Sequence, residues 1–175
     1  NSRDMAQGLT VSEELARTLS FFEGGLDVET RTFRHDLRLV SLHAPKPSKK
    51  AFVSFSSEGG LATPLLYPRA IDLLAERLAI NAGALLSVSR IPMRTFQRRQ
   101  AEGKPLSETE SDRVLRIARV ASQAERAFGS AEKAQRWLVK SNRILGAKPL
   151  EMLATDAGAH GVEAELNRIE WGDYA

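Results

Sequence analysis

The stretch FGSAEKAQRWLVKSNRILGAKPLEML, residues 128–153, decides the fold. Its first half repeats apolar residues at three-and-four spacing, which is typical of an amphipathic helix that packs one stripe against a core. The expected stripe consists of Ala131, Ala134, Trp137 and Leu138. The side chains expected in solvent are Glu132, Lys133, Gln135 and Arg136.

A break and a second short helix complete this stretch. Asn142 and Gly146 are residue types that favour the end of a helix, because both tolerate a left-handed backbone. Pro149 then suits the first position of the next helix, since its missing N–H would have no intrahelical partner there. We therefore expect a tight turn, a short helix over 149–153, and a further helix that ends near Arg168.

The chain before this stretch is also helical, from about residue 67 onward. Pro68 can begin a helix at a position where proline is tolerated. Its expected inward-facing residues are Ile71, Leu74, Ala75 and Leu78. Asn81 and Gly83 interrupt the pattern, which resumes over 84–88 and predicts a second, short helix.

Two further helices are marked by their start and stop signals. Pro92 can begin a helix over 93–100, and Gly103 is placed to stop it. Ser107 with Glu110 three residues later forms the pattern of a capping box at the start of a long helix. The buried side of that helix is predicted to contain Val114, Leu115, Ile117, Ala118, Ala121 and Ala124.

Residues 1–62 have weaker patterns and form a distinct N-terminal arm in this interpretation. Residues 11–22 predict a helix that ends at the glycine pair 24–25, while 30–43 mix helical and alternating spacing. Residues 51–56 are typical of a short strand. Polar connectors rich in proline, serine and glycine separate these pieces, so we expect an arm that is separable from the helical body.

Composition limits the class of protein. The 175 residues suit one domain or two small ones, and the formal charge of +3 with a pI near 9.4 is compatible with an anionic partner without requiring one. The sequence contains no cysteine, which excludes disulfides and thiol chemistry and is compatible with a reducing cytosol. No apolar run approaches the length of a membrane span. We therefore expect a soluble cytoplasmic protein that does not engage a membrane.

The sequence does not favour an enzyme. The three histidines, His35, His43 and His160, lack partners at metal-ligand or catalytic-triad spacing, so satisfied or solvent-exposed histidines are the better interpretation. The glycine pairs lack the strand-to-helix framing that a dinucleotide fingerprint requires. We expect no catalytic residue, no metal and no cofactor.

The quoted stretch closely resembles the toxin-binding domain of the Xre/MbcA/ParS family of bacterial antitoxins. The shared features are an aromatic-Gly step, an Ala-rich helix that ends in Trp-Leu, an Asn before a Leu-Gly pair, and a Pro-Leu-x-x-Leu helix. Residues 91–99, with 106–108 and 111–113, resemble the helix-turn-helix half of the same antitoxins. The resemblance implies a mainly α fold with a helix-turn-helix domain at 63–122 and a toxin-binding domain at 123–175. The N-terminal arm at 1–62 lies outside the resemblance.

The segment at 93–99 is a candidate DNA-reading element. Arginine can contact phosphate or guanine edges, and glutamine can bond adenine edges in the major groove. From composition alone, a solvated basic face on a helix with Met93 and Phe96 in the core is the simpler interpretation. The antitoxin resemblance instead implies binding to operator DNA of the protein's own promoter. The candidate DNA-binding residues are Arg94, Thr95, Gln97, Arg98 and Arg99.

The C-terminal tail is the second candidate site. It places large aromatic side chains where chain ends usually fray, so they require either a fold-back onto the last helix as a core plug or a partner that covers them. In the resembling family, this segment reaches into the active site of a RES-domain toxin that breaks down NAD. The candidate toxin-binding residues are Glu170, Trp171, Gly172, Asp173 and Tyr174.

The sequence-based hypothesis is therefore an Xre-type antitoxin that neutralises a RES toxin and regulates transcription of its own operon. We expect a homodimer, because helix-turn-helix proteins commonly read two half-sites with paired recognition helices. The alternative is a free-standing dimeric helix-turn-helix transcriptional regulator whose C-terminal domain only dimerises.

Overall fold

The computed structural model of the chain describes residues 9–23, 28–30, 39–42, 53–56 and 63–172. Short strands and one helix occupy the N-terminal part, and the helical body begins at residue 68. The N-terminal elements are β1 (Leu9–Ser12), α1 (Glu13–Glu23), β2 (Val28–Thr30), β3 (Leu39–Leu42), β4 (Val53–Ser56) and β5 (Thr63–Leu66). The later helices are α2 (Pro68–Arg77), α3 (Ala82–Val88), α4 (Met93–Glu102), α5 (Glu108–Phe128), α6 (Ala131–Val139), α7 (Pro149–Met152) and α8 (Asp156–Trp171).

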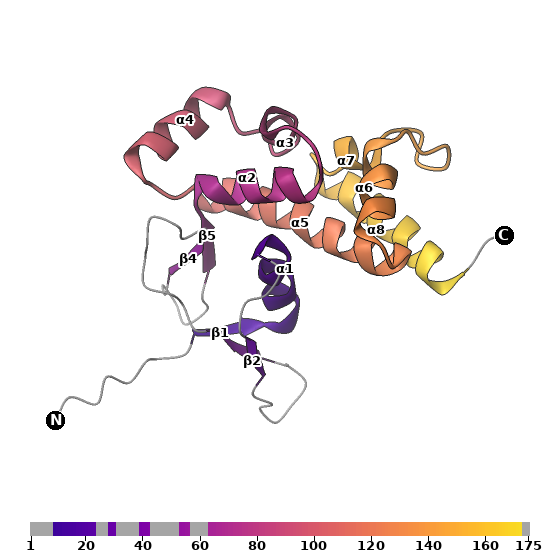
Figure 1. The fold of residues 1–175 in the computed structure, drawn as a ribbon, viewed down its shortest axis with the longest axis horizontal. Helices are drawn as coiled ribbons and strands as arrows, with labels where there is room; N and C mark the ends of the chain where they lie inside the picture. Colours follow the sequence, from indigo (N-terminus) through magenta and orange to yellow (C-terminus); the bar gives the residue numbers. More distant parts are fainter. Residues whose placement is uncertain (1–8, 24–27, 31–38, 43–52, 57–62, 173–175) are drawn as a thin grey trace.

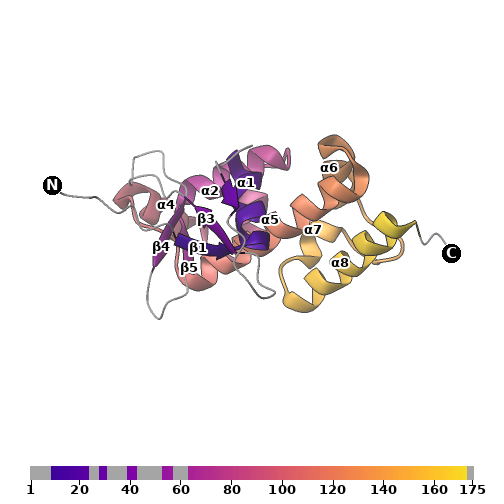
Figure 2. The same ribbon diagram turned by 90° about the horizontal axis from the view of Figure 1, so that it is seen from below.

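Helix α5 runs through the middle of the molecule, with α4 near one end and α6 to α8 at the other in both views (Figures 1 and 2). Its start is the capping box that the sequence predicts, because the Ser107 hydroxyl accepts from the Glu110 N–H at 3.2 Å and the Glu110 carboxylate accepts from the Ser107 N–H at 2.7 Å. The residues expected on its inward side are buried, except Leu115, which is half-buried. The mainly α fold is therefore organised on one long helix that both ends of the body share.

The helices α2, α3 and α4 are each followed, within two residues, by a residue with a left-handed backbone. These residues are Ala79, Arg90 and Gly103, with φ of 53°, 55° and 62°. In each case the residue directly after the left-handed one donates its N–H back to a carbonyl oxygen in the last turn, as in a Schellman motif. The donors are Ile80, Ile91 and Lys104, at 3.0 Å, 2.9 Å and 3.0 Å. The tight turns between these helices thus come from the same hydrogen-bonding device, although only the last of the three uses glycine.

The C-terminal helices follow the turn chemistry of the quoted stretch. The Asn142 side chain accepts from the N–H groups of Ile144 and Leu145, at 2.8 Å and 3.1 Å, and Gly146 has φ of 72°. Helix α8 begins at a Thr155 cap and continues to Trp171, three residues beyond the expected end at Arg168. The predicted turn and short helix are confirmed, and the last helix is longer than predicted.

Two residues of α6 differ from the prediction, one on the expected solvent face and one in the expected apolar stripe. Gln135 is half-buried, and its side-chain amide donates to the backbone oxygen of Arg77 at 2.7 Å. Ala131, which was expected in the apolar stripe, is exposed instead. The stripe of α6 is therefore rotated slightly from the prediction, with Ala134 and Leu138 as its fully buried members.

Helix α1 packs against the helical body. It contacts α5 and α2, and its Leu19 and Phe22 are buried. The guanidinium of Arg77 lies 4.8 Å from the ring centre of Phe21 and also pairs with Glu125 of α5 at 2.9 Å. The helix begins at Glu13 and not at residue 11, because the residues just before it form strand β1.

The strands form two small antiparallel sheets. Strand order in the first is β1-β3-β2, and β4 pairs with β5 in the second. The strand predicted over 51–56 is confirmed as β4, whereas β5 was not expected. The buried Ser111 hydroxyl of α5 accepts from the Leu66 N–H at 3.0 Å, which ties the end of β5 to the central helix.

Candidate functional site

The outer face of α4 presents three of the predicted DNA-binding side chains together. Arg94, Gln97 and Arg98 lie at i, i+3 and i+4 on this helix, and all three are exposed. Thr95 is half-buried, and Phe96 is the buried residue that faces the core. The arrangement offers two guanidinium groups and one amide from one helical face, which suits recognition of phosphates and base edges.

Arg99 differs from the other predicted DNA-binding residues because its guanidinium turns toward the start of α5. It donates to the backbone oxygen of Pro105 at 2.7 Å and pairs with the Glu110 carboxylate at 3.1 Å. Its side chain is 23% exposed. Arg99 therefore does not share the outer face with Arg94, Gln97 and Arg98, and its contact with DNA stays a prediction.

The end of α8 is an exposed apolar feature. Trp171 is 83% exposed, which contradicts the core-plug interpretation for this residue. Glu170 is exposed beside it, and Gly172 ends the helix with φ of 71°. The predicted residues Asp173 and Tyr174 lie outside the described residues.

Helix α8 is held on α5 by polar contacts at regular intervals. Arg116, Arg119 and Gln123 of α5 contact Asp156, Glu163 and Asn167 of α8, at 2.8 Å, 2.8 Å and 2.7 Å. Ala159, Val162 and Leu166 of α8 are buried alongside these contacts. This row of contacts fixes the direction in which α8 carries Trp171 away from the body.

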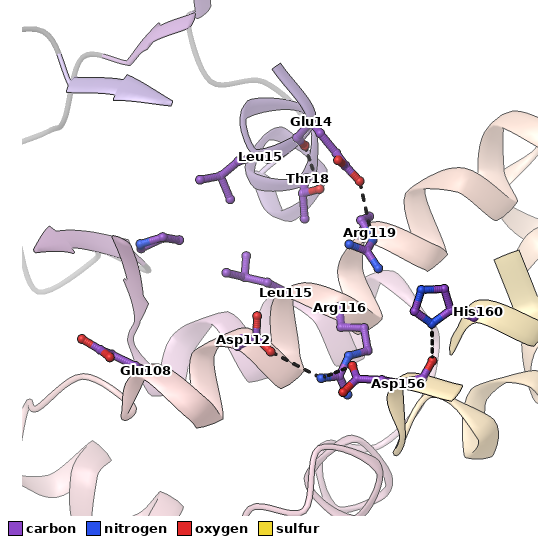
Figure 3. A pocket seen from close by; sticks show the side chains of 11 residues that line it. Glu14, Leu15, Thr18, Glu108, Asp112, Leu115, Arg116, Arg119, Asp156 and His160 are labelled. Carbon is purple, nitrogen blue, oxygen red and sulfur yellow. Dashed lines mark hydrogen bonds and ion pairs between the residues drawn. The ribbon is translucent and has the colours of Figure 1, made fainter. Parts of the chain in front are cut away.

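A cavity of about 470 Å³ lies between α1, α5 and the start of α8 (Figure 3). Its arginines already have acidic partners, since Arg116 contacts Asp112 and Asp156 and Arg119 lies 3.6 Å from Glu14. The Nδ1 atom of His160 lies 2.8 Å from the backbone oxygen of Asp156, so the hydrogen-bond partner of this ring is a backbone group of its own helix. The cavity is polar and charge-compensated, so we assign it no reaction.

The described residues contain neither a cluster of metal ligands nor a helix suited to a membrane. Among them, no group of three or more His, Cys, Asp or Glu side chains is placed to hold a metal ion. His35 and His43 lie outside the part of the chain that the structure describes. No described helix combines the length and apolar character that crossing a membrane requires.

Comparison with known proteins identifies both halves of the helical body. Residues 49–119 match the Antitoxin Xre-like helix-turn-helix domain, and residues 123–172 match the Antitoxin Xre/MbcA/ParS C-terminal toxin-binding domain. Antitoxin Xre of Pseudomonas putida KT2440 is 43% identical over 94 residues, which are 51% of this chain and 59% of that protein. Antitoxin Xre of Photorhabdus laumondii is 32% identical over 104 residues, 58% of this chain and 70% of that protein.

The chain therefore belongs to the Xre family of antitoxins, with a helix-turn-helix domain followed by a toxin-binding domain. The match covers less than two thirds of the Pseudomonas relative. Helix α4 lies within the helix-turn-helix match, and α8 with Trp171 lies within the toxin-binding match. Membership in a family of antitoxins also confirms the prediction that the chain is not an enzyme. Helix α1 precedes both matched regions.

Proposed function

We propose that the C-terminal domain neutralises a RES-domain toxin that degrades NAD, and that the end of α8 enters the active site of this toxin. The observation that carries the proposal is the exposure of Trp171 at the tip of a helix inside the toxin-binding domain. Exposed aromatic side chains of this size are favoured as anchors, because they bury a large apolar area in a partner at little conformational cost. Glu170 beside it supplies a carboxylate for arginines that would otherwise hold the dinucleotide phosphates.

The test is NAD consumption by the cognate toxin in the presence of Trp171→Ala. We expect neutralisation to weaken, because loss of a buried aromatic anchor typically costs about 2 kcal/mol or more of binding. The matched control is Ile144→Ala, which removes another exposed apolar side chain of the same domain, 64% exposed, on the α6–α7 turn. Unchanged neutralisation by Trp171→Ala at limiting antitoxin would remove this tip from the active site.

We propose, second, that the outer face of α4 binds operator DNA and that the protein regulates its own operon as a homodimer. The observation that favours this is the shared exposure of Arg94, Gln97 and Arg98 on α4, which lies inside the helix-turn-helix match. Because α4 and the tip of α8 lie toward opposite ends of α5, DNA and toxin do not compete for one surface in this arrangement (Figure 1).

The alternative is a free-standing dimeric regulator whose C-terminal domain only dimerises. Co-purification from the cytoplasm of the native host separates the two functions. A stoichiometric partner that consumes NAD supports the antitoxin, whereas a lone operator-binding homodimer supports the regulator.

A further inference from the structure

Helix α4 is weakly anchored for a helix that must present side chains in a fixed direction. Of its ten residues, only Phe96 is buried. A single buried side chain fixes the helix at one point, and leaves rotation about that point to be restrained by other contacts. The buried Ile91 and Leu106 hold the chain at the two ends of α4, so a further contact from within the helix helps to set the angle at which its outer face meets DNA.

Arg99 supplies such a contact, one turn after Phe96. Its guanidinium bonds at once to the Pro105 backbone oxygen, at 2.7 Å, and to the Glu110 carboxylate, at 3.1 Å. These two partners lie in the α4–α5 connection and in the first turn of α5. A planar guanidinium can hold two acceptors in one orientation, which an ammonium group does not reproduce.

The acceptor is itself held in place. The same Glu110 carboxylate accepts from the Ser107 N–H at 2.7 Å, and it lies at the helix start, where the backbone dipoles favour negative charge. The side chains of Arg99 and Glu110 are only 23% and 15% exposed, so solvent screens this pair less than a surface pair. We call this arrangement of Arg99, Pro105 and Glu110 the clasp. The Nε atom of Arg99 is buried without a hydrogen-bond partner, and this unsatisfied donor is a cost that the two contacts of the guanidinium must offset.

We propose that Arg99 is a positioning residue, which sets the angle of α4 through Glu110 and does not itself contact DNA. This inference rests on the proposed DNA binding by α4. It separates two arginines that are adjacent in sequence, since Arg98 is exposed on the outer face of α4 and Arg99 pairs with Glu110 of α5.

The test measures binding of the full-length protein to a labelled duplex of the promoter region upstream of its own gene, with a scrambled duplex for comparison. The variants are Arg99→Lys, Arg99→Ala and Glu110→Gln. Glutamine at this position preserves a capping box, so Glu110→Gln removes the charge partner of Arg99 while the start of α5 is retained. Thermal melting checks that each variant is folded at the assay temperature.

We expect each variant to weaken promoter binding on the order of tenfold, with a salt dependence equal to that of the wild type, because no phosphate contact is lost. Combining Arg99→Ala with Glu110→Gln should add little to either single change. Arg98→Ala is the contrasting control, since loss of a phosphate contact lowers the salt slope by about one unit.

Two results overturn the inference. If Arg99→Ala lowers the salt slope by about one unit while Glu110→Gln binds like the wild type, Arg99 is a direct DNA contact. If all three variants bind like the wild type, the clasp has no role in DNA binding. Failure of the proposed function is distinguishable, because the wild type would then bind the promoter duplex no better than the scrambled one.

Discussion

The guanidinium of Arg116 in α5 lies 2.8 Å from the carboxylate of Asp156 in the first turn of α8. This contact begins the row that continues through Arg119–Glu163 and Gln123–Asn167, so α8 is aligned along the same helix whose start clasps α4. Helix α5 therefore positions both candidate binding surfaces, which lie on α4 and at the end of α8. A change in the direction of either helix requires breaking contacts to this central helix.

The close approach of α8 to α7 depends on Gly158. A Cβ at this position would lie 2.0 Å from the backbone oxygen of Met152, a distance that requires the backbone to move. We therefore expect Gly158→Ala to destabilise the protein by about 1–3 kcal/mol, which is the usual cost of overpacking. Gly161→Ala is the matched control, because its Cβ would meet only the Met152 side-chain end at 3.7 Å.

Chemical denaturation of the two alanine variants tests this prediction. Gly161→Ala should be neutral or slightly stabilising, since alanine is about 1 kcal/mol more favourable than glycine inside a helix. Equal midpoints for the two variants would show that the α7–α8 approach is not tight.

Arg90 occupies the left-handed position after α3 that glycine usually fills, with φ of 55°. A side chain there costs about 1–2 kcal/mol, partly offset by its lower unfolded-state entropy compared with glycine. Arg90→Gly should therefore raise the free energy of unfolding by about 0.5–1 kcal/mol, measured by urea denaturation. Arg136→Gly, at an exposed position inside α6, should instead lower it by about 1 kcal/mol. A loss of stability in both variants would contradict the assigned backbone at Arg90.

Local signals in the sequence were sufficient for the helix starts and turns of the body. The capping box at Ser107 and Glu110, the Asn142 turn and the Pro149 start depend on residues within a few positions of one another, and the structure contains all of them. Helix ends with weaker signals were less accurate. The last helix continues past Arg168 because Gly172, and no earlier residue, adopts the left-handed cap.

The fates of individual arginines were not predictable from local pattern. Arg98 and Arg99 are neighbours of the same type, and only the position of α5 decides that Arg98 is exposed while Arg99 pairs with Glu110. One indirect signal for Arg99 was present in the sequence. The capping box places the Glu110 carboxylate at the start of α5, shortly after the end of α4, where an arginine in the last turn of α4 can reach it. The packing of α1 on α5 had no comparable signal, since Arg77, Phe21 and Glu125 meet only in three dimensions.

Leu19 of α1 tests whether the helix before the matched family regions is part of the core. It is fully buried, so Leu19→Ala should lower the free energy of unfolding by about 2–5 kcal/mol. Ile144→Ala removes a largely exposed side chain and should stay within about 0.5 kcal/mol of the wild type. If Leu19→Ala were as mild as the control in thermal and urea unfolding, α1 would be an accessory segment.

The salt dependence of DNA binding tests the outer face of α4. Arg94 and Arg98 are exposed on one face, so we expect each change to alanine to weaken binding to the promoter duplex and to lower the salt slope by about one unit. Gln97→Ala carries no charge change and should instead reduce the preference for the promoter over a scrambled duplex, with the slope retained. Arg136→Ala is the control for a general loss of positive charge, because this arginine is exposed on α6 in the toxin-binding domain. Equal loss of slope in Arg136→Ala and Arg98→Ala would mean that DNA responds only to net charge, and the recognition face on α4 would be rejected.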